Sequence, residues 1–256
     1  MIKVSDDQKA ILTPLFDGIH DSLIISCIQN YFGSAWVDDI VKPASGMILS
    51  GDFCFLAGEP SEEFLCSLEE NFKGRELVVI SDSPQWDVTI EKVFGIRCKK
   101  TERHAIKKEG DIFDRELLKK YAQRLPEGYL LRVIDQSVYD RIMSEEWSRD
   151  FCGNYSSWEH FRDVGMGVAA YCGEELAAGA SSYTSYREGI EIQIITKEEH
   201  RRRGLALACA ASLILMALEH HLYPNWDAAN MTSAAIAQKL GYHYDKPYEA
   251  YDVTVK

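Results

Sequence analysis

The sequence has few of the patterns that mark metal sites, disulfide frameworks or membrane spans. Its seven cysteines are scattered and odd in number, and no CxxC pair occurs. This argues against both disulfide pairing and a structural zinc site. The seven histidines form no HExxH motif, so no metal site is predicted. No window approaches the roughly 20 apolar residues that span a bilayer, and the N-terminus MIKVSDDQKA lacks the layout of a signal peptide. We therefore expect a cytoplasmic protein without a membrane partner.

Positive charge is also scarce. The chain has 28 Lys and Arg against 40 Asp and Glu, a net charge of −12. This argues against a nucleic-acid partner, because contacts to phosphates dominate such binding. From residue 127 onward 12 cations face 19 anions, yet four of these cations, Lys197 and Arg201 to Arg203, lie within seven residues. A local cation cluster in an acidic half predicts a small anionic ligand.

The chain is long enough for two domains, with 256 residues of which 46% are hydrophobic and 27% charged. The helical run IFDRELLKKYAQRL ends at Pro126 and Gly128, and the strand-like YLLRVI follows. We place the boundary there. Residues 1–126 then form an α/β domain of unknown role, with strands at 47–58 and 76–81, a helix at 61–72 and no phosphate loop. Residues 127–256 form the second domain.

The second half alternates strands and helices. A strand at 129–134 is followed by a predicted hairpin at 165–186 and a third strand at 187–196. A helix at 203–221 is apolar on almost every side and hence buried, and a shorter helix at 232–240 ends at Gly241. Two short strands close the chain. Gly165 to Ala170 spells GxGxxA, but a dinucleotide-binding motif must open a helix, so we reject that interpretation.

The segment RRRGLA, from Arg201 to Ala206, joins the third strand to the long helix. The first turn of a helix leaves its N–H groups without intrahelical partners, and the helix dipole adds partial positive charge there. Gly204 lets a ligand approach the backbone, Ala206 keeps the path clear, and the arginines add full charges. These are the requirements of a pyrophosphate site. The alternative is a solvated turn in which the glycine only ends the loop.

Two motifs resemble the GNAT N-acetyltransferases. TKEEHRRRGLA matches the acetyl-CoA signature (Q/R)-x-x-G-x-(G/A) at Arg201, Gly204 and Ala206, and NMTSAAIAQKLGY matches the next helix of that family. The order of strands and helices from residue 128 to 256 is also similar. More narrowly, WDAAN and AQKLGY beside RRRGLA resemble the subgroup that includes the zwittermicin A resistance acetyltransferase. The resemblance implies a GNAT fold, a mixed, mostly antiparallel, splayed sheet with flanking helices, in the second domain.

The resemblance also implies a binding mode for acetyl-CoA as co-substrate. The pantetheine arm would pair with the backbone of the third strand, and the pyrophosphate would lie on the amides that begin the long helix. Polar contacts would come from the start of the next helix. The implied cofactor-binding residues are Ile194, Ile195, Thr196, Arg201, Arg202, Arg203, Gly204, Leu205, Ala206, Leu207, Asn230 and Ser233.

Two catalytic residues are implied in the same way. Family members often place a glutamate on the third strand as general base, which makes Glu191 the first candidate; the alternative is a solvent-facing strand residue. Many relatives have a tyrosine as general acid seven residues after the asparagine, but this sequence has Ala237 there. Tyr244 or His243 is then a substitute, or the thiolate leaves without help. Tyr242 occupies a position that usually packs in the core.

The sequence therefore predicts an acetyl-CoA-dependent N-acetyltransferase that acts on a small amine, which includes the possibility of an antibiotic. Two alternatives stay open, a protein or peptide N-acetyltransferase and a non-catalytic acyl-CoA sensor. A homodimer is common among GNAT relatives and is a further possibility.

Overall fold

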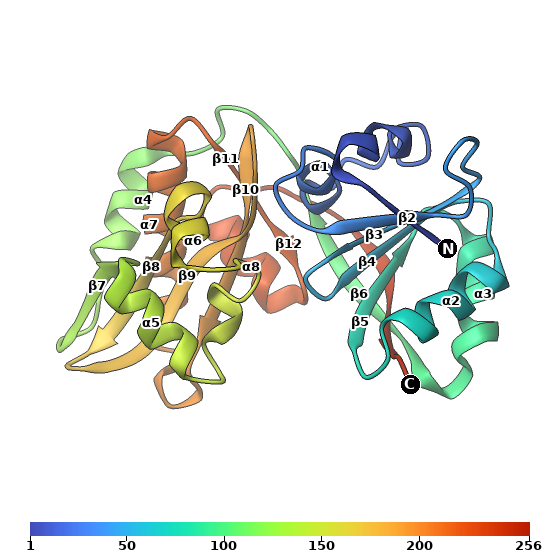
Figure 1. Cartoon of the computed structure of the whole chain (residues 1–256). Coiled ribbons are helices and arrows are strands. Elements are labelled where there is room, and N and C mark those ends of the chain that lie inside the picture. The colour runs from blue at the N-terminus through green and yellow to red at the C-terminus, as the bar shows by residue number, and fades with distance from the viewer. The chain divides into compact units, whose positions relative to one another are not determined.

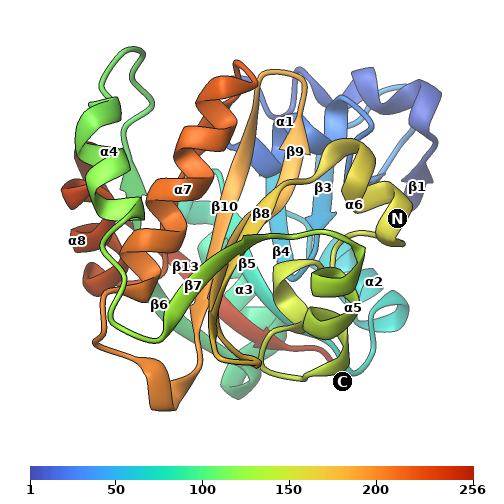
Figure 2. The same cartoon turned by 90° about the vertical axis from the view of Figure 1, so that its left-hand side faces the viewer.

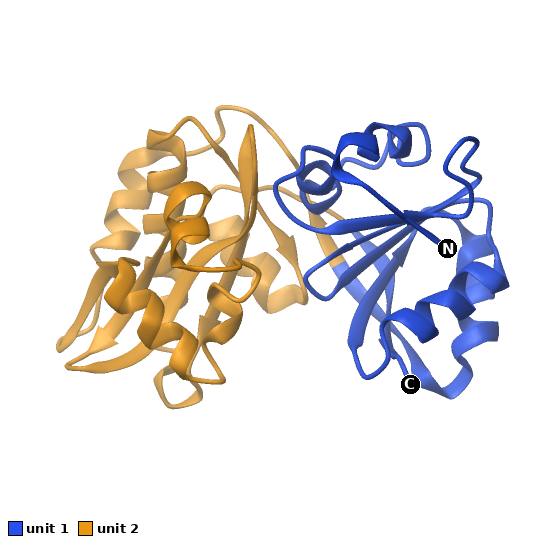
Figure 3. Ribbon diagram, in the orientation of Figure 1, with its two compact units in different colours: residues 1–103, 247–256 blue, residues 104–246 orange.

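The computed structural model describes residues 1–256, which form two compact units (Figure 3). Unit 1 comprises residues 1–103 and 247–256, and unit 2 comprises residues 104–246. The chain passes between the units twice, along strand β6 (Cys98–Ile106) and strand β13 (Tyr244–Thr254). The expected boundary at Pro126 therefore lies inside unit 2.

Two long-range contacts explain where the units divide. Helix α4 (Arg115–Ala122) packs on helix α7 (Leu205–Glu219), and Leu118 is fully buried in the core of unit 2. Residues 104–126 thus belong to unit 2. Strand β13 pairs with β5 (Glu76–Ser81) from Tyr251 to Thr254, so residues 247–256 belong to unit 1. Because both contacts join segments that are far apart in the sequence, the pattern of residues within each segment does not predict them.

The sheet of unit 1 has the strand order β1-β2-β3-β4-β5-β13-β6, and β6 continues into unit 2, where residues 104 and 105 pair with the short strand β12 (Asp227–Ala228). Helices α2 and α3 pack on it through buried side chains that include Phe64, Leu65 and Trp86. Its remaining helices, strands and 3-10 turns (η) are β1 (Ile2–Val4), η1 (Asp6–Leu12), α1 (Ser22–Ile28), β2 (Ser34–Val37), β3 (Ser45–Ser50), β4 (Phe53–Gly58), α2 (Glu62–Asn71), α3 (Pro84–Phe94) and η2 (Gly95–Arg97) (Figure 1).

Unit 2 is a five-stranded sheet in the order β11-β10-β9-β8-β7. Helix α7 lies on one face, where Ala178 and Ala180 of β9 join its core. Side chains alternate along a strand, so Gly179, between Ala178 and Ala180, faces the other side of the sheet. The turn η3 lies there, and its Phe151 contacts Gly179. Figure 2 shows α4 and α7 in this unit. The elements not yet given are β7 (Tyr129–Val133), α5 (Gln136–Ser144), η3 (Arg149–Phe151), α6 (Trp158–Val164), β8 (Gly167–Cys172), β9 (Glu175–Tyr186), β10 (Gly189–Thr196), η4 (Glu198–His200), β11 (Tyr223–Asn225) and α8 (Met231–Lys239).

The two units repeat one topology. Strands β1 to β5 and strands β7 to β11 have the same neighbours in the same senses, three antiparallel pairs and then one parallel pair. Helix α2 connects the parallel pair in unit 1, and α7 connects it in unit 2. In unit 2 the second strand of the parallel pair, β11, is much shorter than β10. Strand β10 pairs with β11 only from Gly189 to Glu191, so its edge from Ile192 to Thr196 has no strand on that side.

The predicted α/β architecture is confirmed, including the mixed, mostly antiparallel sheet with flanking helices in the second half. Two details of the prediction are wrong. Residues 47–58 are not one strand, because Gly51 with a φ of 62° turns the chain between β3 and β4. The C-terminal segment is one long strand, β13, and not two short ones. No helix is long and apolar enough to cross a membrane.

Candidate active site

The turn between β10 and α7 has a backbone shape suited to an anion. Arg202 and Gly204 both adopt left-handed conformations, with φ of 61° and 82°. Left-handed residues within a turn aim successive N–H groups at the same point, which creates a concavity for anions. A Cβ atom placed on Gly204 would meet no atom within 4 Å. The space above the turn is thus open to a ligand.

The N-terminus of α7 has no cap of its own. Gly204 occupies the N-cap position, offers no side-chain hydrogen bond, and no acidic residue lies in the first turn. The corresponding helix of unit 1, α2, is capped by Ser61, whose Oγ accepts from the Phe64 N–H, and it begins with Glu62 and Glu63. Its donors and dipole are therefore already compensated. Only the turn in unit 2 has its donors left for a bound anion.

A chain of polar contacts holds this turn in place. The Lys197 Nζ donates to Glu175 Oε1 at 2.5 Å, and His200 Nε2 lies 3.4 Å from the other carboxylate oxygen. The opposite ring nitrogen of His200 lies 2.7 Å from the Tyr129 hydroxyl. Lys197, followed by His200, lowers the pKa of Glu175 below its usual value. The ion pair thus fixes the residues that precede the arginines.

A cavity of about 680 Å³ lies within unit 2 against this turn. Its walls come from the end of β10, the first turn of α7 and the segment from β11 to α8, and it contains all the predicted cofactor residues except Arg203. These are Ile194, Ile195, Thr196, Arg201, Arg202, Gly204, Leu205, Ala206, Leu207, Asn230 and Ser233. Sequence reasoning missed the other lining residues, which are His200, Trp226, Thr232, Ile236 and Lys239. The unpaired edge of β10 forms one wall.

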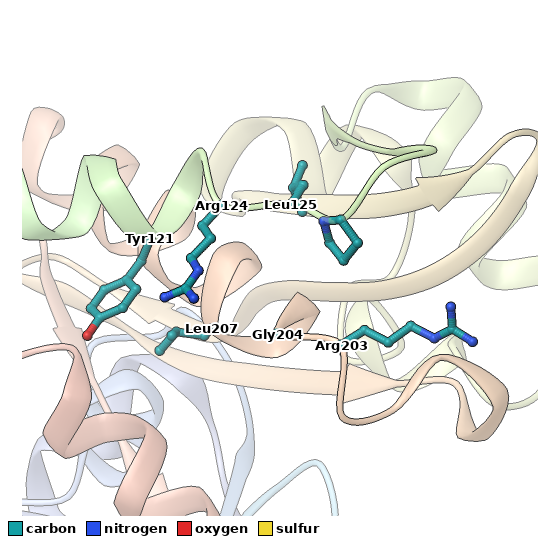
Figure 4. A pocket seen from close by; sticks show the side chains of 7 residues that line it. Tyr121, Arg124, Leu125, Arg203, Gly204 and Leu207 are labelled. Carbon is teal, nitrogen blue, oxygen red and sulfur yellow. The ribbon is translucent and has the colours of Figure 1, made fainter.

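Arg203 lies in a second, smaller cavity of about 420 Å³ (Figure 4). That cavity also involves Tyr121 and Arg124, and it shares Gly204 and Leu207 with the larger one. Figure 4 shows the side chains of Arg124 and Arg203 extending in different directions. The Arg203 guanidinium lies 6.0 Å from the centre of the Tyr129 ring. Its side chain is thus directed away from the large cavity, and only its backbone contributes to the turn there.

Asn230 and Ser233 have structural partners as well as positions in the cavity. The Asn230 Oδ1 accepts from the Ser233 N–H at 3.0 Å, which caps α8. The Trp226 Nε1–H donates to the Ser233 hydroxyl at 3.1 Å. These bonds fix the wall of the cavity opposite β10.

Glu191 is buried, with 7% of its surface exposed, so it is not the solvent-facing strand residue of the alternative interpretation. Its Oε1 accepts from the Asp227 N–H at 2.8 Å, which orients the carboxylate. The residue lies where the pairing of β9 and β10 shifts register, three positions before Ile194 enters the cavity. Bulges of this kind re-aim side chains next to active sites.

The candidate general acids lie outside the lining of the cavity. The Tyr244 hydroxyl lies 3.3 Å from His104 Nδ1, and His243 Nδ1 lies 2.7 Å from Glu109 Oε2. The Tyr242 hydroxyl donates to the Pro224 carbonyl at 2.6 Å, and burial raises its pKa well above the usual value. Tyr242 therefore packs in the core, as predicted.

Comparisons with known proteins identify the family of this chain. Residues 13–251 match the family described as GNAT acetyltransferase. A Bacillus subtilis (strain 168) protein, "Uncharacterized N-acetyltransferase YdfB", is 26% identical over 233 residues, which are 87% of this chain and 86% of the relative. The crystal structure of a GCN5-related N-acetyltransferase-like protein from Streptococcus suis 89/1591 has a TM-score of 0.90 at 39% identity. That comparison covers 96% of this chain and 98% of the other.

A tandem GNAT protein from the clavulanic acid biosynthesis pathway shares the fold alone, with a TM-score of 0.59 at 12% identity over 98% of this chain and 96% of that one. The family model and the 39% identical structure thus define the fold as that of an acyltransferase. The chain belongs to the GNAT acetyltransferase family.

Proposed function

We propose that this protein transfers the acetyl group of acetyl-CoA to the amine of a small molecule. One observation carries the proposal: a single cavity joins the unpaired edge of β10 to the uncapped, arginine-flanked N-terminus of α7. A strand edge offers alternating N–H and C=O groups to an extended amide chain, as in the pantetheine arm. A free helix N-terminus suits a pyrophosphate.

The residues present fit the cofactor in both charge and shape. Amides from Arg203 to Leu207 would hold the pyrophosphate, with Arg201 and Arg202 adding charge at the rim of the cavity. The backbone of Ile194 to Thr196 would hold the pantetheine arm. Acetyl-CoA supplies the acetyl group as a thioester.

Glu191 is the proposed general base. In the transfer, the amine nitrogen forms a bond to the acetyl carbon, the carbon–sulfur bond breaks, and the electron pair goes to the thiolate. The amine proton passes to Glu191, directly or through water, and the thiolate later takes a proton from solvent or from a nearby acid. Tyr244 stays a proposed acid, because no tyrosine lines the cavity in place of the one missing at Ala237.

The acceptor is proposed to be a small cationic amine. The acidic excess of the chain favours a cation, and Glu191 is buried instead of lying on an exposed surface that an extended peptide could cover. The resemblance to the zwittermicin A resistance subgroup makes an amine-bearing antibiotic one such acceptor.

The test is calorimetric titration with acetyl-CoA, followed by thiol release against a panel of small amines and lysine peptides. We expect binding and release of CoA with a small amine. Release with peptides alone would exclude the small-molecule function, and binding without release would indicate a sensor. Absence of binding would refute the assignment of the cavity.

A further inference from the structure

Three polar side chains lie side by side on the face of the unit 2 sheet opposite α7. Thr184 of β9 pairs with Glu191 of β10, and Glu191 pairs with Asn225 of β11. Paired residues on neighbouring strands share a face, and Ile190 and Ile192 on either side of Glu191 belong to the α7 core. All three are buried, with exposed fractions of 0%, 7% and 1%. They form what we call the polar row.

The amide of Asn225 is oriented by its own donors. Its Nδ2 group donates to the Tyr186 hydroxyl and to the Ile190 carbonyl, both at 2.9 Å. A flipped amide would place its oxygen against that carbonyl, so the assignment of the two atoms is unambiguous. The Oδ1 atom is buried and has no hydrogen-bond partner. A fixed acceptor is thus left without a donor.

The local backbone favours this arrangement. A Cβ atom on Gly189 would lie 2.7 Å from the Tyr186 hydroxyl and 2.4 Å from the Tyr223 carbonyl. Only glycine allows the tyrosine to cross β10 and reach Asn225. Tyr186 therefore holds the amide in place across the neighbouring strand.

The other end of the polar row has a second unsatisfied atom, because the Thr184 hydroxyl is also buried and has no partner. A buried polar group without a hydrogen-bond partner destabilises the folded state, and native proteins keep few such groups. Here two of them flank the proposed base. This arrangement is expected where a ligand supplies the missing hydrogen bonds.

The chemistry of the row indicates what that ligand carries. Asn225 Oδ1 and the Glu191 carboxylate can only accept, so the ligand must present two donors. The row follows neighbouring strands, which lie about 4.8 Å apart, so these donors are close neighbours in the ligand. An amine between Thr184 and Glu191 and a hydroxyl between Glu191 and Asn225 would meet this requirement.

We propose that the polar row binds the acceptor, and that the acceptor is a primary amine with a hydroxyl group on the adjacent carbon. This inference rests on the proposed function, since it places the reacting amine beside Glu191. Asn225 would recognise the hydroxyl, and Thr184 would accept a hydrogen bond from the amine.

The experiment compares matched amines that differ only in the hydroxyl: ethanolamine against propylamine, and 2-amino-1,3-propanediol against 3-aminopentane. CoA release is measured for wild type, Thr184→Val and Asn225→Leu. We expect wild type to favour the hydroxylated member of each pair at least tenfold in kcat/KM. Asn225→Leu should remove that preference by losing rate with the hydroxylated member only. Thr184→Val should slow both members alike.

Measurements of Tm and of acetyl-CoA affinity distinguish a loss of acceptor recognition from a loss of folding. Thr184→Val replaces an unpartnered hydroxyl with a methyl group of equal size, so Tm should stay equal or rise while kcat/KM falls. The matched control is Ser50→Ala in unit 1, which also removes a buried, unpartnered hydroxyl and should leave transfer unchanged. Acetyl-CoA affinity should be the same in all these proteins.

Three outcomes would overturn the inference. The first is a wild-type enzyme that releases CoA with amines but ignores the hydroxyl. The second is full activity in Thr184→Val and retained preference in Asn225→Leu. The third is binding of acetyl-CoA without release of CoA in the presence of any amine. That result would refute the proposed function together with this inference, whereas the first two would refute this inference alone.

Discussion

The substitution Gly204→Glu tests the proposed cofactor site most directly. Gly204 has a φ of 82°, so any other L-residue there is strained by roughly 1–2 kcal/mol. Its absent Cβ faces open space, so the folded protein has room for the new side chain. The carboxylate would stand in the space proposed for the pyrophosphate. Two like charges about 4 Å apart repel by about 4 kcal/mol at an effective dielectric of 20, which is nearly a thousandfold in affinity.

The matched control is Gly173→Glu in the β8–β9 turn. Gly173 also has a positive φ, 59°, and also has no atom within 4 Å of a built Cβ, but it lies outside both cavities. The assay is calorimetric titration of acetyl-CoA beside a thermal melt of each variant. We expect similar losses of Tm in the two variants and a loss of affinity in Gly204→Glu alone. Unchanged affinity in Gly204→Glu would refute the assignment of this turn.

Three further predictions concern catalysis, stoichiometry and pH. Glu191→Gln should keep acetyl-CoA affinity and lower kcat by roughly 10²–10⁴-fold, most strongly at low pH, where amines need a base; an unaltered pH–rate profile would exclude this role. Calorimetry should give one acetyl-CoA per chain, because the N-terminus of α2 is capped by Ser61 and begins with Glu62; a second equivalent would contradict this. Lys197 holds the pKa of Glu175 below its usual value. The resulting stabilisation is present above the unfolded pKa of about 4.3 and is lost as pH falls through the folded pKa. Glu175→Gln should thus lower acetyl-CoA affinity a few-fold at pH 7, with a difference from wild type that vanishes in acid; a constant difference would exclude the ion pair.

Unit 1 repeats the topology of unit 2, which the sequence analysis did not predict. Its strands and connecting helix match those of unit 2 in order and sense. The turn that would hold an anion instead carries Glu59, a serine cap and two further glutamates. Carboxylates at a compensated helix N-terminus disfavour a pyrophosphate. The topology occurs in both units, whereas the uncapped helix start with adjacent arginines is found in unit 2.

The sequence by itself determined the local shape of the turn at which we propose that the cofactor binds. RRRGLA depends on local physics, since a glycine with a positive φ, an uncapped helix start and adjacent arginines are all encoded within a few residues. The apolar pattern of α7 likewise predicted a buried helix behind that turn. Position along β10, the following turn and α7 brought nine of the predicted residues into one cavity, and Asn230 and Ser233 join them from the start of α8.

The tertiary structure decided what local patterns cannot express. Thr184, Glu191 and Asn225 became neighbours only through the register of three strands and a bulge beside Glu191. The Arg203 guanidinium lies over the Tyr129 ring, outside the large cavity. The unit boundary depended on the pairing of Tyr251 with Val79. Each of these rests on contacts between segments distant in sequence, whose energy comes from packing and strand pairing and not from local conformational preference.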